Sequence, residues 1–315
     1  MEEQRQKYGE LLQQLPLETV DYAFAYGSGA LQQKGEKKEE KMVDFILSTS
    51  EPEKFHRANL ERNGHHYSLL RIAGPRVISQ FQTTFGAHVY FNTQVLVGQR
   101  TIKYGIISTQ DLKTDLLDWK WLYVAGRLQK PVLEIISQRD DIAGWIKANR
   151  LNALNAALLQ LHETFSLRDL FRKIVELSYM GDFRMLIGED KNKVAKIVDG
   201  SYGELAETYR YLLSEDKRIF VKSDAVIQQE YSQNSIADRI NHLPANVKGR
   251  LSSSYQKEAQ SIDPNDLTRQ LSSAIGSVVA PVALVQTAKN AVSAGILRSI
   301  IYSIAKMKKM LKSVR

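Results

Sequence analysis

A short turn and a nearby carboxylate are the residues of this chain best suited to chemistry on phosphate groups. The apolar run 22–26 ends at Gly27-Ser28-Gly29, which predicts a strand entering a tight turn. Gly27 lets the main chain approach a triphosphate, and its amide and the Ser28 hydroxyl can donate to phosphate oxygens. Asp44, in the next apolar run, can hold a magnesium ion that bridges those phosphates. Taken alone, Gly-Ser is more typical of an ordinary turn than of a phosphate site.

The strand that carries Asp44 lacks a second acid on the same face. Side chains two residues apart on a strand share a face, and position 46 is Ile46. At least one further metal ligand would therefore come from another part of the chain. Four acids remain open as candidates: Asp111, Asp115, Asp118 and Asp182.

These residues lie in elements that alternate between strands and helices, which predicts a mixed α/β domain at residues 1–137. Apolar runs bounded by turn residues predict strands at 22–26, 42–47, 89–97, 101–107 and 132–136. Helices are predicted at 52–62, at 67–85 with a break at Gly74-Pro75, and at 111–123.

From Asp141 the spacing of apolar residues becomes helical, which predicts a small helical domain at 138–225. Ser166 followed by Asp169 is typical of a capping box at a helix start. Further helices are predicted at 191–198 and 202–213. Residues 226–296 form a C-terminal region for which we predict no defined domain structure.

Composition excludes several classes of protein. The chain has 315 residues with 43% hydrophobic and 25% charged content, which is typical of a globular protein of about two domains. The absence of cysteine excludes disulfides, thiolate zinc sites, iron–sulfur clusters and cysteine nucleophiles. Residues 1–5 include two acids and no apolar run, so we expect neither a secretory signal nor a transit peptide.

The net charge of +8 belongs entirely to the C-terminal end of the chain. Residues 269–315 contain eight Lys and Arg and no Asp or Glu, whereas residues 1–268 carry 35 charges of each sign. A nucleic-acid-binding protein usually spreads its basic residues over a broad face. We therefore expect no nucleic-acid partner.

Residues 297–315 combine this charge with an apolar stripe. Apolar residues recur there at steps of three and four, which predicts a basic amphipathic helix lying in the interface of an anionic membrane. The alternative is a docked helix with a solvated cationic face. Residues 274–296 are interrupted by Pro281 and Lys289 and are not expected to span a membrane. The candidate membrane-binding residues are Arg298, Ile301, Ile304, Lys308, Lys309, Leu311 and Lys312.

A set of short motifs occurs in a characteristic order along the chain. They are Tyr26-Gly-Ser-Gly29, Val43-Asp-Phe-Ile46, His56 with Asn59 and Asn63, His66-Tyr-Ser68, Lys103-Tyr-Gly105, Tyr123-Val-Ala-Gly-Arg-Leu-Gln-Lys-Pro131, Gly181-Asp-Phe-Arg-Met185 and the ending Tyr302–Leu311. Together they resemble the translocator assembly and maintenance family, the mitochondrial-type phosphatidate cytidylyltransferases (CDP-diacylglycerol synthases). The resemblance runs from about residue 20 to the C-terminus.

The resemblance implies transfer of a cytidylyl group from CTP to phosphatidic acid, with release of pyrophosphate and a requirement for Mg²⁺. It also implies a polymerase-β-like nucleotidyltransferase domain, a winged-helix-like second domain and a C-terminal membrane-binding helix. Because the N-terminus lacks a presequence, we expect a bacterial member at the cytoplasmic face of a membrane. The alternative is the matrix side of the mitochondrial inner membrane. The sequence does not indicate an oligomeric state.

The resemblance also assigns roles to individual residues. Ser28 and Asp44 are the expected catalytic residues, and Asp44 is the expected metal ligand. The residues expected to bind CTP are Tyr26, Gly27, Ser28, Lys103, Tyr104, Arg127, Lys130, Asp182 and Arg184.

Simpler structural roles remain open for some of these residues. Lys103 has the alternative of a solvated strand lysine, and Arg127 and Lys130 that of surface cations. Asp182 and Arg184 have the alternative of an ion pair within their own domain.

A polar helix face adds no metal site to this prediction. His56, Asn59 and Asn63 share one face because of their three- and four-residue spacing. A hydrogen-bonded histidine is favoured there over a metal ligand, and the three residues are expected in the scaffold or at the rim of the substrate site.

Two other functions remain open. One is an inactive nucleotidyltransferase-like adaptor at membranes, which the missing second strand carboxylate favours. The other is a nucleotidyltransferase that modifies RNA or a small molecule, which the confinement of basic charge to the tail disfavours.

Overall fold

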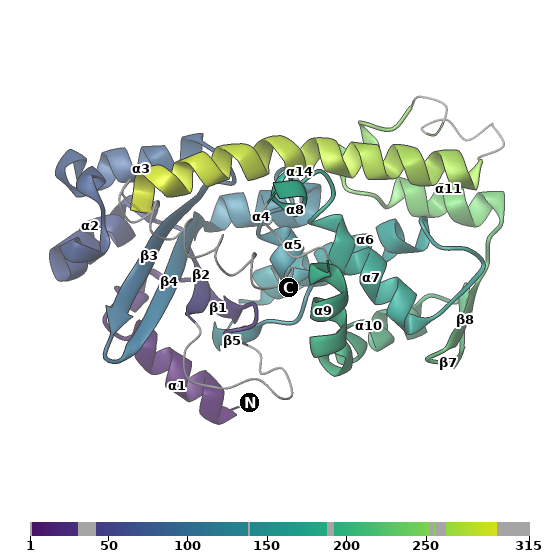
Figure 1. Cartoon of the computed structure of the whole chain (residues 1–315), viewed down its shortest axis with the longest axis horizontal. Helices are drawn as coiled ribbons and strands as arrows, with labels where there is room; N and C mark the ends of the chain where they lie inside the picture. Colours follow the sequence, from purple (N-terminus) through teal and green to yellow (C-terminus); the bar gives the residue numbers. More distant parts are fainter. Residues whose placement is uncertain are drawn as a thin grey trace. The chain divides into compact units, whose positions relative to one another are not determined.

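The computed structural model describes residues 2–30, 42–137, 139–187, 192–252, 255 and 263–294 (Figure 1). The chain forms two compact units, and each unit is assembled from non-contiguous stretches of the chain. The first unit takes Met1–Lys113, Val132–Ala143 and the chain from Val282 on, and the second takes Thr114–Pro131 and Gly144–Pro281. The boundary that we predicted near residue 137 therefore lies within a segment of the first unit.

The first unit is built on a five-stranded mixed sheet in the order β3-β4-β2-β1-β5 (Figure 1). Only the β2–β4 pair is parallel; the other pairs are antiparallel. All five predicted strands are confirmed. They are β1 (Tyr22–Tyr26), β2 (Val43–Thr49), β3 (Val89–Val97), β4 (Arg100–Ser108) and β5 (Leu133–Ile136).

Helices cover one face of this sheet. The α1 side chains Tyr8 and Leu12 and the α2 side chain Phe55 pack with Phe45 and Tyr104 from the strands in one buried cluster. Helix α1 was not predicted from the sequence. The helices and 3₁₀ turns of this unit are α1 (Glu2–Leu12), η1 (Leu17–Thr19), α2 (Pro52–Asn63), η2 (Gly64–His66), η3 (Leu69–Ala73) and α3 (Gly74–Thr84).

A buried polar network joins α2, α3 and the segment between them. The His56 ring is within hydrogen-bond distance of the Tyr67 hydroxyl (2.9 Å) and of Gln82 Oε1 (2.8 Å). Burial lowers the pKa of His56 to about 4, because a charged imidazole would lose its hydration. Of the two roles predicted for His56, scaffold or substrate rim, its buried ring has the scaffold role. The predicted break at 74–75 is also confirmed, since Gly74 has φ +83° and separates η3 from α3.

The second unit consists of helices and a three-stranded sheet in the order β6-β8-β7. The predicted capping box is present, with Ser166 and Asp169 bonded to each other's main-chain N–H groups. The strands are β6 (Thr164–Phe165), β7 (Ile219–Ser223) and β8 (Val226–Gln229). The helices are α5 (Ala125–Leu128), α7 (Leu167–Leu177), α8 (Arg184–Ile187), α9 (Lys193–Gly200), α10 (Tyr202–Glu215), α11 (Gln233–Asn241) and α12 (Ala245–Lys248).

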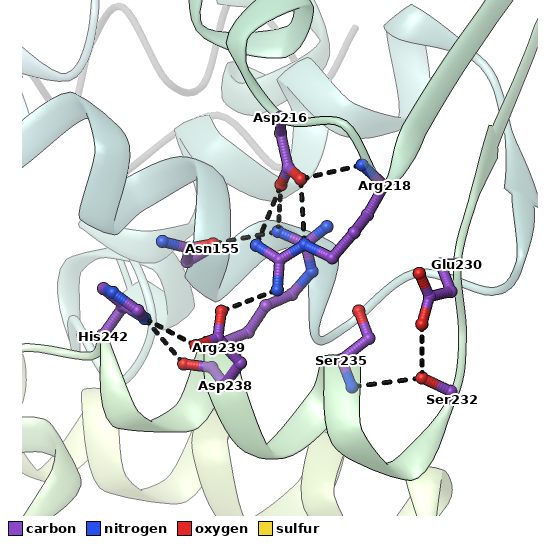
Figure 2. Close-up of polar contacts among 9 residues, drawn as sticks. All are labelled: Asn155, Asp216, Arg218, Glu230, Ser232, Ser235, Asp238, Arg239 and His242. Atoms are coloured by element: carbon purple, nitrogen blue, oxygen red, sulfur yellow. Dashed lines mark hydrogen bonds and ion pairs between the residues drawn. The ribbon is translucent and has the colours of Figure 1, made fainter.

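A buried arginine fastens α11 to the rest of the second unit (Figure 2). Arg239 is 2% exposed, and its Nη1 lies 2.9 Å from Asp216 Oδ2 and 3.0 Å from Asn155 Oδ1. Arg218 bridges Asp216 and Asp238 at 2.9 and 2.6 Å. Two arginines and two aspartates thus compensate one another, as a buried charge requires.

Three helices contribute residues to both units: α4 (Thr109–Asp118), α6 (Asp140–Leu158) and α14 (Pro264–Ala294). Among the described helices, α14 alone is long and apolar enough to cross a membrane, a test that core helices also pass. Its Gln286 bonds the main chain of β3 at Val89 O (3.1 Å) and the preceding Ala87 N (2.9 Å).

Helix α4 ends earlier than predicted because a buried carboxylate accepts hydrogen bonds from the main chain that follows the helix. Asp115 accepts hydrogen bonds from the main-chain N–H groups of Trp121, Tyr123, Val124 and Ala125 at 2.8–3.1 Å. The predicted continuation to residue 123 is therefore wrong. Burial raises the pKa of Asp115, and the four N–H donors oppose that rise.

We predict that Asp115→Ala lowers the free energy of unfolding by about 3 kcal/mol or more, because four buried N–H donors lose their acceptor. Asp118→Ala is the matched control, since Asp118 is exposed at the end of the same helix. Urea unfolding of both variants measures the difference. Equal stabilities would contradict a structural role for Asp115.

Candidate active site

The register between β1 and β2 brings the predicted turn and the predicted carboxylate together. Tyr26 pairs with Asp44, so Asp44 lies beside the residue that precedes Gly27. Gly27 has φ +79°, a conformation that favours glycine. Its carbonyl accepts a hydrogen bond from Ala30 N (3.0 Å), which closes the turn. Gly27 and Ser28 are both exposed, and the turn can therefore meet a ligand.

Helix α1 holds this turn from its far side. The Tyr8 hydroxyl donates to Gly29 O and Gln4 Nε2 donates to Ala30 O, both at 2.6 Å. A Cβ on Gly29 would lie 2.5 Å from Met42 O, so glycine is required where the turn passes the start of β2. Tyr8 and Gln4 are positioning residues that sequence reasoning missed, since no local pattern links them to the turn.

Lys103 lies next to Asp44 on the same face of the sheet. The two residues pair across β2 and β4, and Lys103 Nζ is 3.6 Å from Asp44 Oδ1. The same ammonium lies 4.3 Å from the centre of the Phe91 ring. Both side chains keep about a quarter of their surface exposed. A carboxylate and an ammonium therefore stand side by side next to the turn.

Tyr104 lies on the opposite face of the sheet, and the structure does not bring it to Asp44. It is fully buried, and its hydroxyl lies 2.9 Å from Asn59 Nδ2 and 2.8 Å from His66 Nδ1. Burial raises the pKa of Tyr104. Consecutive strand residues point to opposite faces, so Lys103 and Tyr104 do not share the proposed nucleotide site. The expected role of Tyr104 is corrected to a core residue.

Most of the acids considered as a second metal ligand are already hydrogen-bonded to other residues of the fold. Asp111 lies 3.0 Å from His88 Nδ1 and accepts from Ser108 Oγ at 2.6 Å, and Asp115 is committed to main-chain donors. Asp118 is exposed at the end of α4. Within the described ranges, no group of three or more His, Asp or Glu could hold a metal ion.

One further carboxylate shares the face of Asp44. Glu134 pairs with Phe24, and the Tyr22 hydroxyl lies 3.4 Å from its Oε1. Among the described strands, Asp44 and Glu134 are the only acids. The sequence signal that could have found Glu134 is its position in the predicted strand 132–136.

The second unit gathers cations around α5 and α9. Lys130 Nζ donates to Ser178 Oγ at 2.8 Å and lies 5.3 Å from the centre of the Tyr179 ring. Lys193 Nζ lies 5.1 Å from the centre of the same ring. Burial, together with the nearby charges of Arg127 and Lys193, lowers the pKa of Lys130 to about 7. Such convergence of cations suits an anionic ligand.

Arg184 is held in place by its neighbour in the sequence. Asp182, 4% exposed, accepts from Arg184 Nε and Nη2 at 2.5–3.0 Å. Asp182 and Arg184 therefore form the ion pair within one domain that was predicted as the alternative. Arg184 is close enough to Arg127 for the charges to interact, and Arg127 stacks on Tyr123 with Cζ 3.9 Å from the ring centre.

The predicted residues thus form two groups, one in each unit. Tyr26, Gly27, Ser28, Asp44 and Lys103 gather in the first unit. The second unit holds Arg127, Lys130, Asp182 and Arg184, to which the structure adds Lys193, a residue that sequence reasoning missed. The predicted membrane-binding residues, from Arg298 to Lys312, lie outside the described residues.

Comparison with known proteins gives matches along nearly the whole chain. The family model described as "Phosphatidate cytidylyltransferase, mitochondrial" matches residues 8–309. A Caenorhabditis elegans protein of that name is 51% identical over 318 residues, which cover 98% of this chain and 99% of the relative. The Bos taurus protein of the same name is 38% identical and covers 94% of this chain and 92% of its own length.

The names and sources of these relatives correct one expectation. Both are animal proteins named mitochondrial, so a bacterial member at a cytoplasmic membrane is not supported. That expectation was based on the residues at the N-terminus alone. The family resemblance read from the ordered motifs is confirmed.

We predict that the affinity of the chain for inorganic triphosphate falls several-fold as the pH rises through the Lys130 pKa of about 7, because a neutral amine no longer attracts an anion. Calorimetric titration across this pH range measures the change. Lys130→Met should remove this part of the pH dependence.

Lys147→Met is the matched control and should keep the pH dependence, because Lys147 is an exposed lysine that also lies over a tyrosine ring, 5.3 Å from the centre of Tyr211. An unchanged pH profile in Lys130→Met would contradict the role of Lys130 in anion binding.

Proposed function

The chain belongs to the mitochondrial phosphatidate cytidylyltransferase family, and from this premise we propose that it transfers the cytidylyl group of CTP to phosphatidate. The products are CDP-diacylglycerol and pyrophosphate. The observation that carries the proposal is the exposed Gly27-Ser28 turn beside Asp44, in a chain similar along its length to proteins of that name.

The reaction is a displacement at the α-phosphorus of CTP. A phosphate oxygen of phosphatidate forms the new bond to that phosphorus, and the bond to the bridging oxygen of the β-phosphate breaks. Pyrophosphate leaves with the electron pair of that bond. Because the attacking phosphate is already ionised, a general base is not required, and positioning and charge stabilisation carry the catalysis.

The residues around the turn are suited to hold the triphosphate. The Gly27 amide and the Ser28 hydroxyl supply donors to phosphate oxygens, as main-chain turns do in other phosphate sites. Lys103 supplies a positive charge next to them. We assign Tyr26 to the wall of this site, because it is half-buried and pairs with Asp44.

Magnesium fits the donor set on this face. Mg²⁺ is commonly held by one or two carboxylates together with substrate phosphates, and Asp44, about a quarter exposed, offers such a carboxylate. Glu134 shares this face but lies two strands from Asp44, so we assign Asp44 alone as the protein carboxylate of the ion. When bound, the ion would neutralise charge on the triphosphate.

The cations of the second unit are proposed to bind anionic substrate. Lys130 interacts electrostatically with both Arg127 and Lys193, and this repulsion is relieved when an anion binds. The Asp182 carboxylate holds the Arg184 guanidinium in a fixed orientation. These contacts support a phosphate-binding role for the group.

We further assign the fold and the location of the protein. The first unit, with its mixed sheet and the turn after β1, is assigned as a nucleotidyltransferase domain. The second unit, with its helices and the β7–β8 hairpin, is assigned as winged-helix-like. The relatives' names support a mitochondrial location, and we place the protein on the matrix side of the inner membrane, bound through its basic C-terminal segment.

We predict that Asp44→Asn lowers kcat at least about 100-fold, since charge stabilisation at the reacting phosphates is lost. The assay follows CDP-diacylglycerol formation from labelled CTP, phosphatidic acid vesicles and Mg²⁺. Glu51→Gln is the control, because Glu51 also forms an ion pair in the first unit, with Lys54 at 2.9 Å, but is exposed.

Thermal unfolding should show that both variants fold like the parent chain. Near-parental turnover in Asp44→Asn would refute this site. A parent chain with no turnover would favour the inactive adaptor instead.

We predict a smaller loss for Ser28→Ala, about tenfold in kcat/KM for CTP, because the turn's main-chain amides remain available as donors. Steady-state kinetics with varied CTP measures it. If both kcat and KM stayed at their parental values, the turn would have only a structural role.

A further inference from the structure

The turn η3 exposes two large aliphatic side chains. Leu69 and Ile72 are each 80% exposed, the highest values among the large hydrophobic residues of the described chain. The next highest, Leu96 on β3, is 66% exposed. Isolated exposed aliphatic residues are common, but two that protrude from one five-residue turn form a local apolar tip.

The turn is anchored on one side by packing and by a hydrogen bond, so that the exposure of its other side is part of the fold. Leu70, between the two exposed residues, packs against the buried cluster of Tyr67, Ile78 and Tyr90. The Ser68 side chain caps the turn by accepting from Leu70 N at 3.4 Å. Burying Leu70 therefore leaves its neighbours pointing outward.

The last described turn of α14 lies against the start of η3. Ser68 Oγ lies 3.3 Å from Val292 O, and Val292 is itself 49% exposed. Lys289 fixes this end of the helix by donating to Gln82 O and Phe85 O at 2.7 and 2.8 Å. Helix α14 and the turn thus form one apolar rim, which we define as Leu69, Ile72 and Val292.

The charges around the rim favour an anionic partner. Arg71 within the turn and Arg76 just after it are both exposed, and no Asp or Glu occurs between Glu61 and Asp111. The chain also continues past α14 into residues 295–315, which contain six Lys and Arg and no acid. Aliphatic tips flanked by arginines suit a lipid surface, where apolar side chains enter the acyl boundary and cations meet phosphate headgroups.

We propose that the η3 turn inserts Leu69 and Ile72 into the interface of a bilayer that contains phosphatidic acid. The turn is a membrane contact separate from the basic C-terminal segment, and it begins beside Val292, close to the last described residue of α14. The choice of phosphatidic acid as the anionic lipid rests on the proposed function. The insertion itself rests on the exposure, anchoring and charge of the turn.

The absence of cysteine in the chain allows a direct test by site-specific labelling. Ile72→Cys, carried in the full chain and labelled with an environment-sensitive fluorophore, should show a blue shift and a rise in emission with vesicles of phosphatidylcholine and phosphatidic acid. Leu96→Cys is the matched control and should show neither change. No response at position 72 would overturn the proposal.

A fluorophore at position 72 that is already shielded in lipid-free protein would also overturn the proposal. Another part of the chain or a second copy would then cover the turn. A solvated fluorophore before the addition of vesicles is the supporting result.

Binding measurements give a second, independent test. The double variant Leu69→Ser/Ile72→Ser should bind these vesicles at least about tenfold more weakly in co-sedimentation, because two aliphatic side chains no longer leave water. Arg71→Gln should weaken binding about fivefold, and only at low salt. Leu96→Ser should bind like the parent chain, and equal binding by the double variant would refute the insertion.

Turnover separates this inference from the proposed function. With a water-soluble short-chain phosphatidate, the double variant should match the parent chain, because the turn contributes no residue to the site around Asp44. With vesicles, its turnover should fall with its binding. A parent chain inactive on both substrates would refute the proposed function and leave the vesicle-binding result to decide the insertion.

Discussion

The register of three adjacent strands is the constraint on which the candidate site depends. Asp44 on β2 pairs with Tyr26 on β1 and with Lys103 on β4. The turn after β1, the carboxylate and the ammonium therefore lie together at one end of these strands. A slip of one residue would turn Asp44 into the core and Phe45 out of it. The burial of Phe45 against helix α1 therefore fixes the position of the site.

The two units contribute different charges to the proposed chemistry. The sheet face of the first unit offers the Asp44 carboxylate next to Lys103, with Glu134 further along the same face, which suits a metal ion and a triphosphate. In the second unit, burial lowers the pKa of Lys130, and the nearby charges of Arg127 and Lys193 lower it further. Catalysis that depends on neutralising phosphate charge, and needs no base, is consistent with this division.

Buried polar networks elsewhere in the molecule have structural roles. Asp115 ends α4 and shapes the segment that leads to Arg127. Arg239 joins α11 to Asn155 and Asp216 (Figure 2). The Asp115 carboxylate is paired with four main-chain donors, and the charge of Arg239 is paired with Asp216, as low-dielectric surroundings require.

The sequence by itself determined much of the local structure and the family. Apolar runs bounded by turn residues predicted all five strands of the main sheet, and Gly74-Pro75 and Ser166 correctly marked a helix break and a helix start. These features depend on neighbours in the chain, which a sequence pattern records directly. The ordered motifs indicated the family for the same reason, since each is a short local run.

Tertiary structure alone decided which residues meet. Strand alternation shows that Lys103 and Tyr104 face opposite sides, yet only strand pairing shows that Lys103 shares the side of Asp44. Helix propensity could not reveal that Asp115 would draw the following chain away from the helix. The approach of Lys193 to Lys130 and the exposure of Leu69 likewise depend on contacts between distant segments. Such contacts are set by packing over the whole chain, and no local pattern of residues encodes them.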